Sequence, residues 1–138
     1  VIGKKELSEA FSPGSHGSTF GGNMLAMAAA NATLETIFES SFLEEVSAKG
    51  AFLHQQLKEK LQFPLVKDIR GKGLIAGIEC KEPVQPLIEA LQKEGLLVLP
   101  AGPNVIRLLP PLTVAKSEIK AAVEKMKAVM ADHSAVKQ

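Results

Sequence analysis

The chain has 138 residues, of which 46% are hydrophobic and 22% charged, a composition typical of a folded, soluble protein. Its net charge of +1 and its lack of Trp and Tyr argue against a nucleic-acid partner, and no stretch approaches the ~20 apolar residues of a membrane span. The single cysteine, Cys80, excludes an internal disulfide and favours a reducing, cytoplasmic compartment.

The N-terminal part of the chain predicts two helices around a loop. Residues 4–11 favour a short helix, and residues 12–15 (SPGS) are typical of a turn. Asn23 is a good N-cap for a helix over about 24–39. Its first turns are apolar on nearly every side, and such a helix is normally buried all round. We therefore expect it to need cover from protein outside this chain.

The next segment predicts a long helix followed by a hairpin. Residues 42–61 carry apolar side chains at helical spacing, and Gly50 lies in line with them, where a close neighbour could pack. Residues 65–70 and 74–80 are β-prone runs around a glycine-bearing turn, which is typical of a hairpin. The expected buried face of the helix consists of Leu43, Val46, Leu53, Leu57 and Leu61.

The C-terminal part predicts helix, strand, strand, helix. An amphipathic helix spans 84–94, and Gly95 ends it. Strands follow at 96–99 and 105–109, and the last helix spans about 116–131 before a polar tail that should fray. The expected buried face of this last helix consists of Ile119, Val123, Met126 and Met130. The whole order favours an α+β fold with about four short strands covered on one side by helices.

Residues 16–23 form the most informative motif, HGSTFGGN, which runs directly into the predicted helix. Hydroxyls and backbone N–H groups next to a helix N-terminus suit an anion such as a phosphate. From spacing alone, the more common explanation is a glycine-rich loop whose hydroxyls satisfy local backbone groups. Both explanations stay open at the level of residue types.

The unbroken octapeptide resembles a segment of acetylornithine aminotransferases and their subgroup-III relatives, which are pyridoxal-phosphate enzymes. One position departs from the common pattern, because Met24 stands where a proline usually follows the asparagine. The resemblance spans essentially the whole chain. It implies the C-terminal small domain of a fold-type-I enzyme over residues 42–138, preceded by a C-terminal remnant of the large pyridoxal-phosphate-binding domain over residues 1–41.

The resemblance also implies roles for three residues. Thr19 would contact the phosphate of pyridoxal phosphate across a homodimer interface, and Ser18 would contact the acetylornithine substrate. Arg107, in the run VIRLLPP, matches the family's arginine before a Pro-Pro pair and would clamp the substrate α-carboxylate. Without the resemblance, a structural ion pair or a solvent-reaching arginine explains Arg107 at least equally well.

The other candidate residues are not expected to form a catalytic or metal site. The lysine that binds the cofactor lies upstream of the octapeptide in the family, and no lysine here occupies its position, so we expect no catalytic residue and an inactive fragment. The three histidines do not combine with Cys80 into a metal spacing, and His54 and His133 are expected in solvent. The segment Arg70-Gly71-Lys72-Gly73 resembles the family's RGxGL element and is interpreted as structural.

The function implied by the resemblance is transfer of the ω-amino group of N-acetylornithine to 2-oxoglutarate in arginine biosynthesis, by a cytoplasmic homodimer. Related aminotransferases for ornithine, succinylornithine or 4-aminobutyrate share most of these features. A different class also remains, namely a non-catalytic, stand-alone small domain that binds a partner or an anion.

Overall fold

The computed structural model describes residues 4–12 and 14–135, apart from the side chain of Ser8. The chain divides into two compact units, Val1–Glu39 and Ser40–Gln138. Each unit is described by itself below. The assignment of residues 1–41 to a large domain and of residues 42–138 to a small domain stays a prediction.

The first unit contains the 3-10 helix η1 (Lys5–Ala10) and the helix α1 (Met24–Ile37). The prediction that Asn23 caps α1 is confirmed, because its side-chain oxygen accepts a hydrogen bond from the backbone N–H of Ala26 at 2.9 Å. No residue of α1 is buried, and Met24 is 90% exposed. The turn predicted at 12–15 includes Pro13, which lies outside the described residues.

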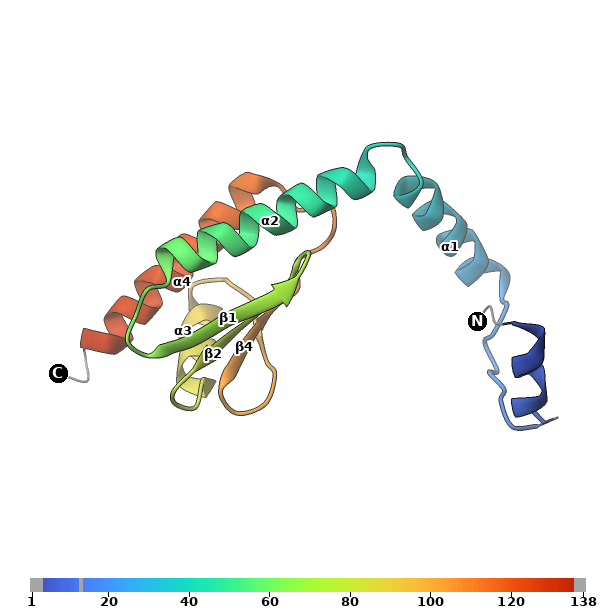
Figure 1. Ribbon diagram of the computed structural model, residues 1–138, viewed down its shortest axis with the longest axis horizontal. Coiled ribbons are helices and arrows are strands. Elements are labelled where there is room, and N and C mark those ends of the chain that lie inside the picture. The colour runs from blue at the N-terminus through green and yellow to red at the C-terminus, as the bar shows by residue number, and fades with distance from the viewer. Residues whose placement is uncertain (1–3, 13, 136–138) are drawn as a thin grey trace. The chain divides into compact units, whose positions relative to one another are not determined.

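The second unit has an α+β fold (Figure 1), as the order of the predicted elements indicated. Its four strands form one antiparallel sheet in the order β1-β2-β4-β3, and the helices α2 and α4 lie side by side over it. The elements, in chain order, are α2 (Phe42–Lys60), β1 (Val66–Lys72), β2 (Ile75–Cys80), α3 (Gln85–Lys93), β3 (Leu99–Pro100), β4 (Val105–Leu108) and α4 (Lys116–Ala135).

The strand predicted at 96–99 is wrong in extent, since β3 begins only at Leu99. The end of α3 explains the difference. The N–H of Leu96 donates to the carbonyl of Leu91 at 2.9 Å, and the N–H of Gly95 donates to that of Gln92 at 3.0 Å. This pair of bonds is a Schellman cap, which keeps Leu96 in the helix terminus and delays the strand.

The core fills the space between the sheet and the helices of the second unit. Along β2 and β4 the buried residues alternate with residues of the other face, so that Ile78 and Ile106 point inward while Gly77 and Arg107 lie outside. The predicted inner face of α4 is confirmed by burial of Ile119, Val123, Met126 and Met130. In α2, Leu53 and Leu57 are buried as predicted, and so is Leu61 at the C-cap of the helix.

Leu43, predicted on the same buried face of α2, is instead 56% exposed. It lies in the first turn of the helix, and the first buried residue of α2 is Gly50, about two turns later. The hydrophobic spacing identified the correct side of the helix, but it could not show where along the helix the neighbouring elements begin.

Gly50 packs directly against the β1–β2 turn, which confirms its predicted close contact and supports a structural role for the two glycines of Arg70-Gly71-Lys72-Gly73. A Cβ added at Gly50 would lie 2.7 Å from the Cα of Gly73. Gly73 has a φ of +58° and Gly71 a φ of +153°, conformations that other residues rarely adopt. The glycines are therefore required by the turn and by the helix that packs on it.

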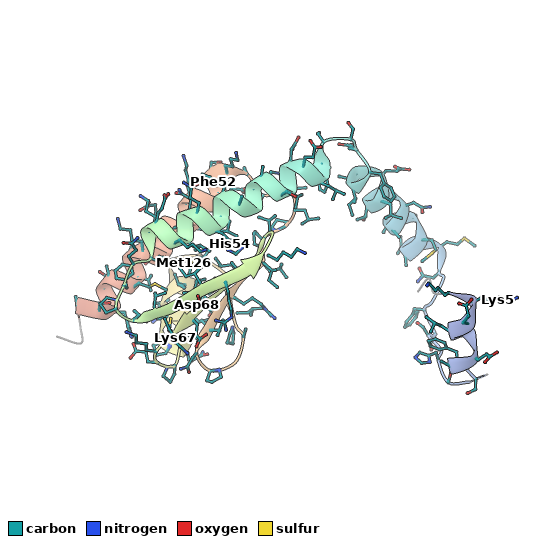
Figure 2. All side chains as sticks on the ribbon, in the orientation of Figure 1. Lys5, Phe52, His54, Lys67, Asp68 and Met126 are labelled. Atoms are coloured by element: carbon teal, nitrogen blue, oxygen red, sulfur yellow. The ribbon has the colours of Figure 1, made fainter. Side chains whose placement is uncertain are left out.

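The expectation that His54 and His133 lie in solvent is wrong for both. His54 faces the hairpin beside Gly71, and its Nε2 atom is buried without a hydrogen-bond partner (Figure 2). His133 Nε2 lies 2.8 Å from Glu82 Oε1, in a half-buried pair. His54 is covered because the hairpin packs on its side of α2. For His133 the reason is that α4 continues to Ala135, one turn beyond the predicted end; the rest of the predicted tail, 136–138, lies outside the described residues.

Candidate functional site

The loop 16–23 is held by short-range hydrogen bonds of its own residues and leads directly into α1. The N–H of Gly21 donates to the carbonyl of Ser18 at 3.1 Å, and Asn23 Nδ2 donates to the carbonyl of Phe20 at 2.6 Å. Because Asn23 also caps α1, the loop and the helix N-terminus form one local structure. His16 packs its ring against Phe11, with centroids 4.9 Å apart.

Ser18 and Thr19 are exposed in this loop, and neither hydroxyl makes a hydrogen bond to another described residue. Both hydroxyls are therefore free to donate to an anion near the positive end of α1. The predicted roles of Thr19 toward a phosphate and of Ser18 toward a substrate stay predictions. Both residues belong to the first unit, whereas Arg107 belongs to the second.

In the second unit, the sheet face away from the helices carries a row of cross-strand neighbours. Gly77 of β2 is directly opposite Arg70 of β1 on one side and Arg107 of β4 on the other, and Leu99 of β3 completes the row. The two arginines therefore flank a position without a side chain. They line a surface hollow of about 370 Å³ together with Gly71, Ile75, Ala76, Gly77, Ala101 and Val105.

Arg107 is half-buried on β4 and forms no ion pair or side-chain hydrogen bond with any described residue. The structural ion pair that could explain an arginine in an apolar strand is thus not formed within the described part of the chain. A guanidinium presents five donors in a planar fork, which suits bidentate binding of a carboxylate. The predicted role of Arg107 as a carboxylate clamp stays a prediction.

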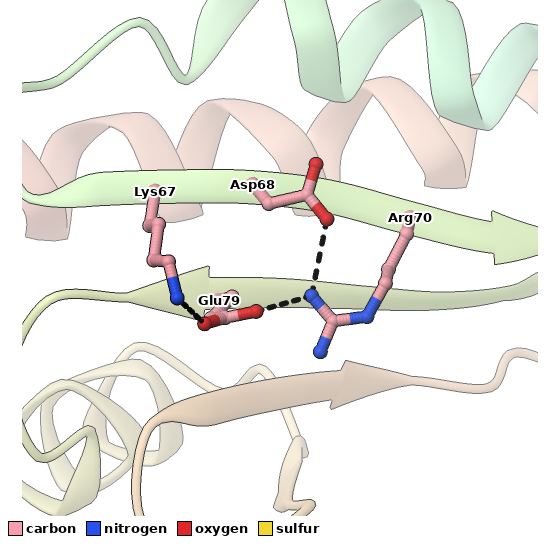
Figure 3. Close-up of polar contacts among 4 residues, drawn as sticks. All are labelled: Lys67, Asp68, Arg70 and Glu79. Atoms are coloured by element: carbon pink, nitrogen blue, oxygen red, sulfur yellow. Dashed lines mark hydrogen bonds and ion pairs between the residues drawn. The ribbon is translucent and has the colours of Figure 1, made fainter.

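Arg70 differs from Arg107 because it belongs to a charged network on the same face of the sheet (Figure 3). Its Nη1 atom lies 2.5 Å from Glu79 Oε2 and 3.1 Å from Asp68 Oδ2, and Lys67 Nζ lies 2.5 Å from Glu79 Oε1. Hydrogen bonds from Lys67 and Arg70 lower the pKa of Glu79, and those to Glu79 and Asp68 raise the pKa of Arg70.

The sequence reasoning missed this network. The sequence feature that could have predicted the network is the spacing of three charged residues, Asp68, Arg70 and Glu79. They lie on the same face of β1 and β2, and the opposite face of these strands contributes to the core. Period-two spacing predicts that shared face, but only the register of the hairpin shows that Glu79 lies opposite Asp68 and beside Arg70.

The remaining reactive groups offer little chemistry. Burial raises the pKa of the Cys80 thiol to about 11, so this thiol is not a nucleophile near neutral pH. Within residues 4–12 and 14–135, His, Cys, Asp and Glu side chains do not gather in groups of three or more as metal ligands do. No helix of the described residues is long and apolar enough to cross a membrane.

The α+β unit, the glycine-rich loop before α1 and the unpaired arginine on β4 agree with one known family. Residues 1–130 match the family model of class-III aminotransferases, and the chain belongs to this family.

Named relatives within this family carry a more specific description. The chain is 67% identical over its whole length to the acetylornithine aminotransferase of Bacillus subtilis, and 56% identical over 94% of its length to that of Bacillus anthracis. It covers 36% and 34% of those proteins, so it spans about a third of the length of the relatives it matches. A crystal structure of a Bacillus anthracis aminotransferase superimposes with a TM-score of 0.82 and 35% identity, over 94% of this chain and 34% of that one.

Proposed function

We propose that this chain forms part of an aminotransferase that transfers the ω-amino group of N-acetylornithine to 2-oxoglutarate in arginine biosynthesis. The observation that carries the proposal is the unpaired guanidinium of Arg107 in the hollow on the sheet. The 67% identity to the Bacillus subtilis acetylornithine aminotransferase supports the choice of amino donor over ornithine, succinylornithine or 4-aminobutyrate.

The cofactor of this reaction is pyridoxal phosphate, which acts as an electron sink when it is bound. The described residues fit such a group, because the Thr19 hydroxyl is exposed, has no partner among them and lies in the loop that leads into α1. Thr19 would bind the phosphate through this hydroxyl, aided by the positive end of the helix. No lysine of this chain is assigned to the cofactor.

Arg107 would bind and orient the substrate, and it would not transfer protons. Amino donor and 2-oxoglutarate both present a carboxylate, so one arginine can position both in successive half-reactions. A bidentate contact restrains the ligand in one orientation, which lowers the entropic part of the barrier. Ser18 would add a contact to the acyl-ornithine.

The same proposal describes a cytoplasmic homodimer in which Thr19 of one subunit serves the cofactor of the other. Its support lies in the first unit, where α1 has no buried residue and Phe20 in the loop is 80% exposed. An apolar surface of this kind needs protein cover, and a second subunit would supply it.

The test is substitution of Arg107 in the full-length enzyme. Arg107→Ala should lower kcat/KM for both N-acetylornithine and 2-oxoglutarate, corresponding to a loss on the order of 2–4 kcal/mol in transition-state binding. Lys58→Ala, which removes an exposed charge from α2, is the control and should leave both values unchanged. Unchanged kcat/KM values in Arg107→Ala would make this arginine merely structural and remove the basis of the proposal.

A further inference from the structure

Glu79 has an arginine diagonal to it on each of the two neighbouring strands. The residue directly opposite Glu79 is Asp68 on β1 and Val105 on β4. Arg70 and Arg107 each lie two residues further along those strands, so both are diagonal neighbours of Glu79 on one face of the sheet. Diagonal neighbours of this kind are within reach of long side chains.

Of the two diagonal pairs, only that between Arg70 and Glu79 is formed. Arg70 holds one carboxylate oxygen of Glu79 at 2.5 Å, and Lys67 holds the other at the same distance. Figure 3 shows that both cations that contact Glu79 extend from β1. Both oxygens are engaged, and Arg107 makes no ion pair with the described residues.

Gly77 offers Arg107 no side-chain partner from the directly opposite position on β2. It is directly opposite Arg107, where a side chain would lie closest to the guanidinium. An added Cβ would lie 3.2 Å from Val105 Cγ1, which is tighter than ordinary contact, so Val105 would have to shift to admit a side chain there. Among the residues of β2 that are opposite or diagonal to Arg107, Glu79 is then the acidic one that could pair with it.

We propose that Lys67 and Arg70 are positioning residues that hold Glu79 away from Arg107 and so keep Arg107 available for a substrate carboxylate. The importance of this for catalysis rests on the proposed function of Arg107. If the two cations are removed, Glu79 loses both partners and can turn toward Arg107. It then competes with the substrate as an internal carboxylate.

The first experiment measures this pairing without cofactor or activity. In the 138-residue chain, the Nε–Hε resonance of Arg107 is assigned by comparison with Arg107→Lys and followed by NMR as the carboxyl groups titrate. In the double variant K67Q/R70Q, the resonance should move with the titration of Glu79. It should stay constant in the unsubstituted chain and in K67Q/R70Q/E79Q. A constant resonance in the double variant would overturn the proposal.

The second experiment measures the consequence in the full-length enzyme. K67Q/R70Q should raise KM for both carboxylate substrates by about two- to fivefold, the range for exposed ion pairs, with little change in kcat. Adding Glu79→Gln should restore KM, which a merely structural role for Lys67 and Arg70 does not predict. Lys60→Gln, which breaks an exposed ion pair with Glu124 outside the sheet, is the control.

The outcomes separate this inference from the proposed function. If K67Q/R70Q raises KM and the added Glu79→Gln does not restore it, the positioning role is overturned. Circular dichroism of every variant checks that each one is folded. If the NMR signal moves in the double variant while KM stays constant, Glu79 does reach Arg107. The proposed carboxylate clamp is then the part that fails.

Discussion

At the residue scale, the start of α4 has one half of a capping box. Glu118 Oε2 accepts a hydrogen bond from the backbone N–H of Ala115 at 2.7 Å, and the carbonyl of Ala115 accepts from Glu118 and Ile119, each at 3.1 Å. In a complete box, the residue at position 115 would return a side-chain oxygen to the N–H of Glu118. Alanine has none, so one N–H group lacks this partner.

Ala115→Ser should therefore stabilise the fold by about 0.5–2 kcal/mol, the range for N-cap exchanges. Thermal and urea unfolding of the two proteins would measure it. Ala121→Ser, on the exposed side of the same helix, is the matched control and should be slightly destabilising because serine has the lower helix propensity. An unchanged unfolding midpoint in Ala115→Ser would show that the hydroxyl does not cap the helix.

At the element scale, the contact between α2 and the β1–β2 hairpin depends on the absence of a side chain at Gly50. The atoms that an added Cβ would meet at 2.7–2.8 Å belong to the backbone of Gly73, which cannot turn aside as a side chain can. The register of helix and hairpin is therefore sensitive to one methyl group.

Gly50→Ala should destabilise the protein by about 1–3 kcal/mol, the usual cost of overpacking, although alanine is the better helix former. Ser47→Ala, on an exposed side of the same helix, should be neutral or slightly stabilising. Urea unfolding of both variants gives the comparison. A more stable Gly50→Ala protein would mean that the hairpin moves away from α2 at no cost.

At the scale of the whole molecule, the hydrophobic core lies in one of the two units. Every buried hydrophobic side chain among the described residues, from Leu53 to Met130, belongs to Ser40–Gln138. The described residues of Val1–Glu39 contribute none. Burial of apolar surface is the main favourable term in folding, so the second unit should account for the measured stability.

Residues 40–138 alone should consequently unfold within about 2 °C of the complete chain, because the loss of 1–39 removes less than about 0.5 kcal/mol. Differential scanning calorimetry of the two proteins tests this. A markedly lower midpoint for the shorter protein would show that the first unit stabilises the second.

The proposed dimer predicts that two inactive enzymes complement each other. A full-length Thr19→Ala enzyme mixed with a variant lacking the cofactor-binding lysine should regain part of the activity, since some heterodimers then have one site with neither lesion. Exchange of subunits must be shown independently, for example by mass spectrometry. If subunits exchange and activity does not rise, Thr19 acts within its own subunit.

Much of the fold followed from local signals. Asn23 predicted the cap of α1, the glycine-bearing turn predicted the hairpin, and helical spacing predicted the inner face of α4. Each depends on hydrogen bonds or side chains within a few residues. The candidate site was predictable only in part, because Thr19, Ser18 and Arg107 came from motif resemblance, whereas the network around Glu79 depends on the pairing of strands.

The sequence by itself determined most of the type and order of the elements, because these depend on residue type and short-range spacing. The family and the residues proposed for phosphate and carboxylate also came from the sequence, but through the resemblance of its motifs to a known family. Only the tertiary structure decided that His54 is enclosed, that Leu43 is exposed, and that Glu79 pairs with Arg70 and not with Arg107. Those outcomes depend on which surfaces meet and in what register. Burial and ion pairing are properties of neighbours in space, and residues far apart in the chain supply those neighbours.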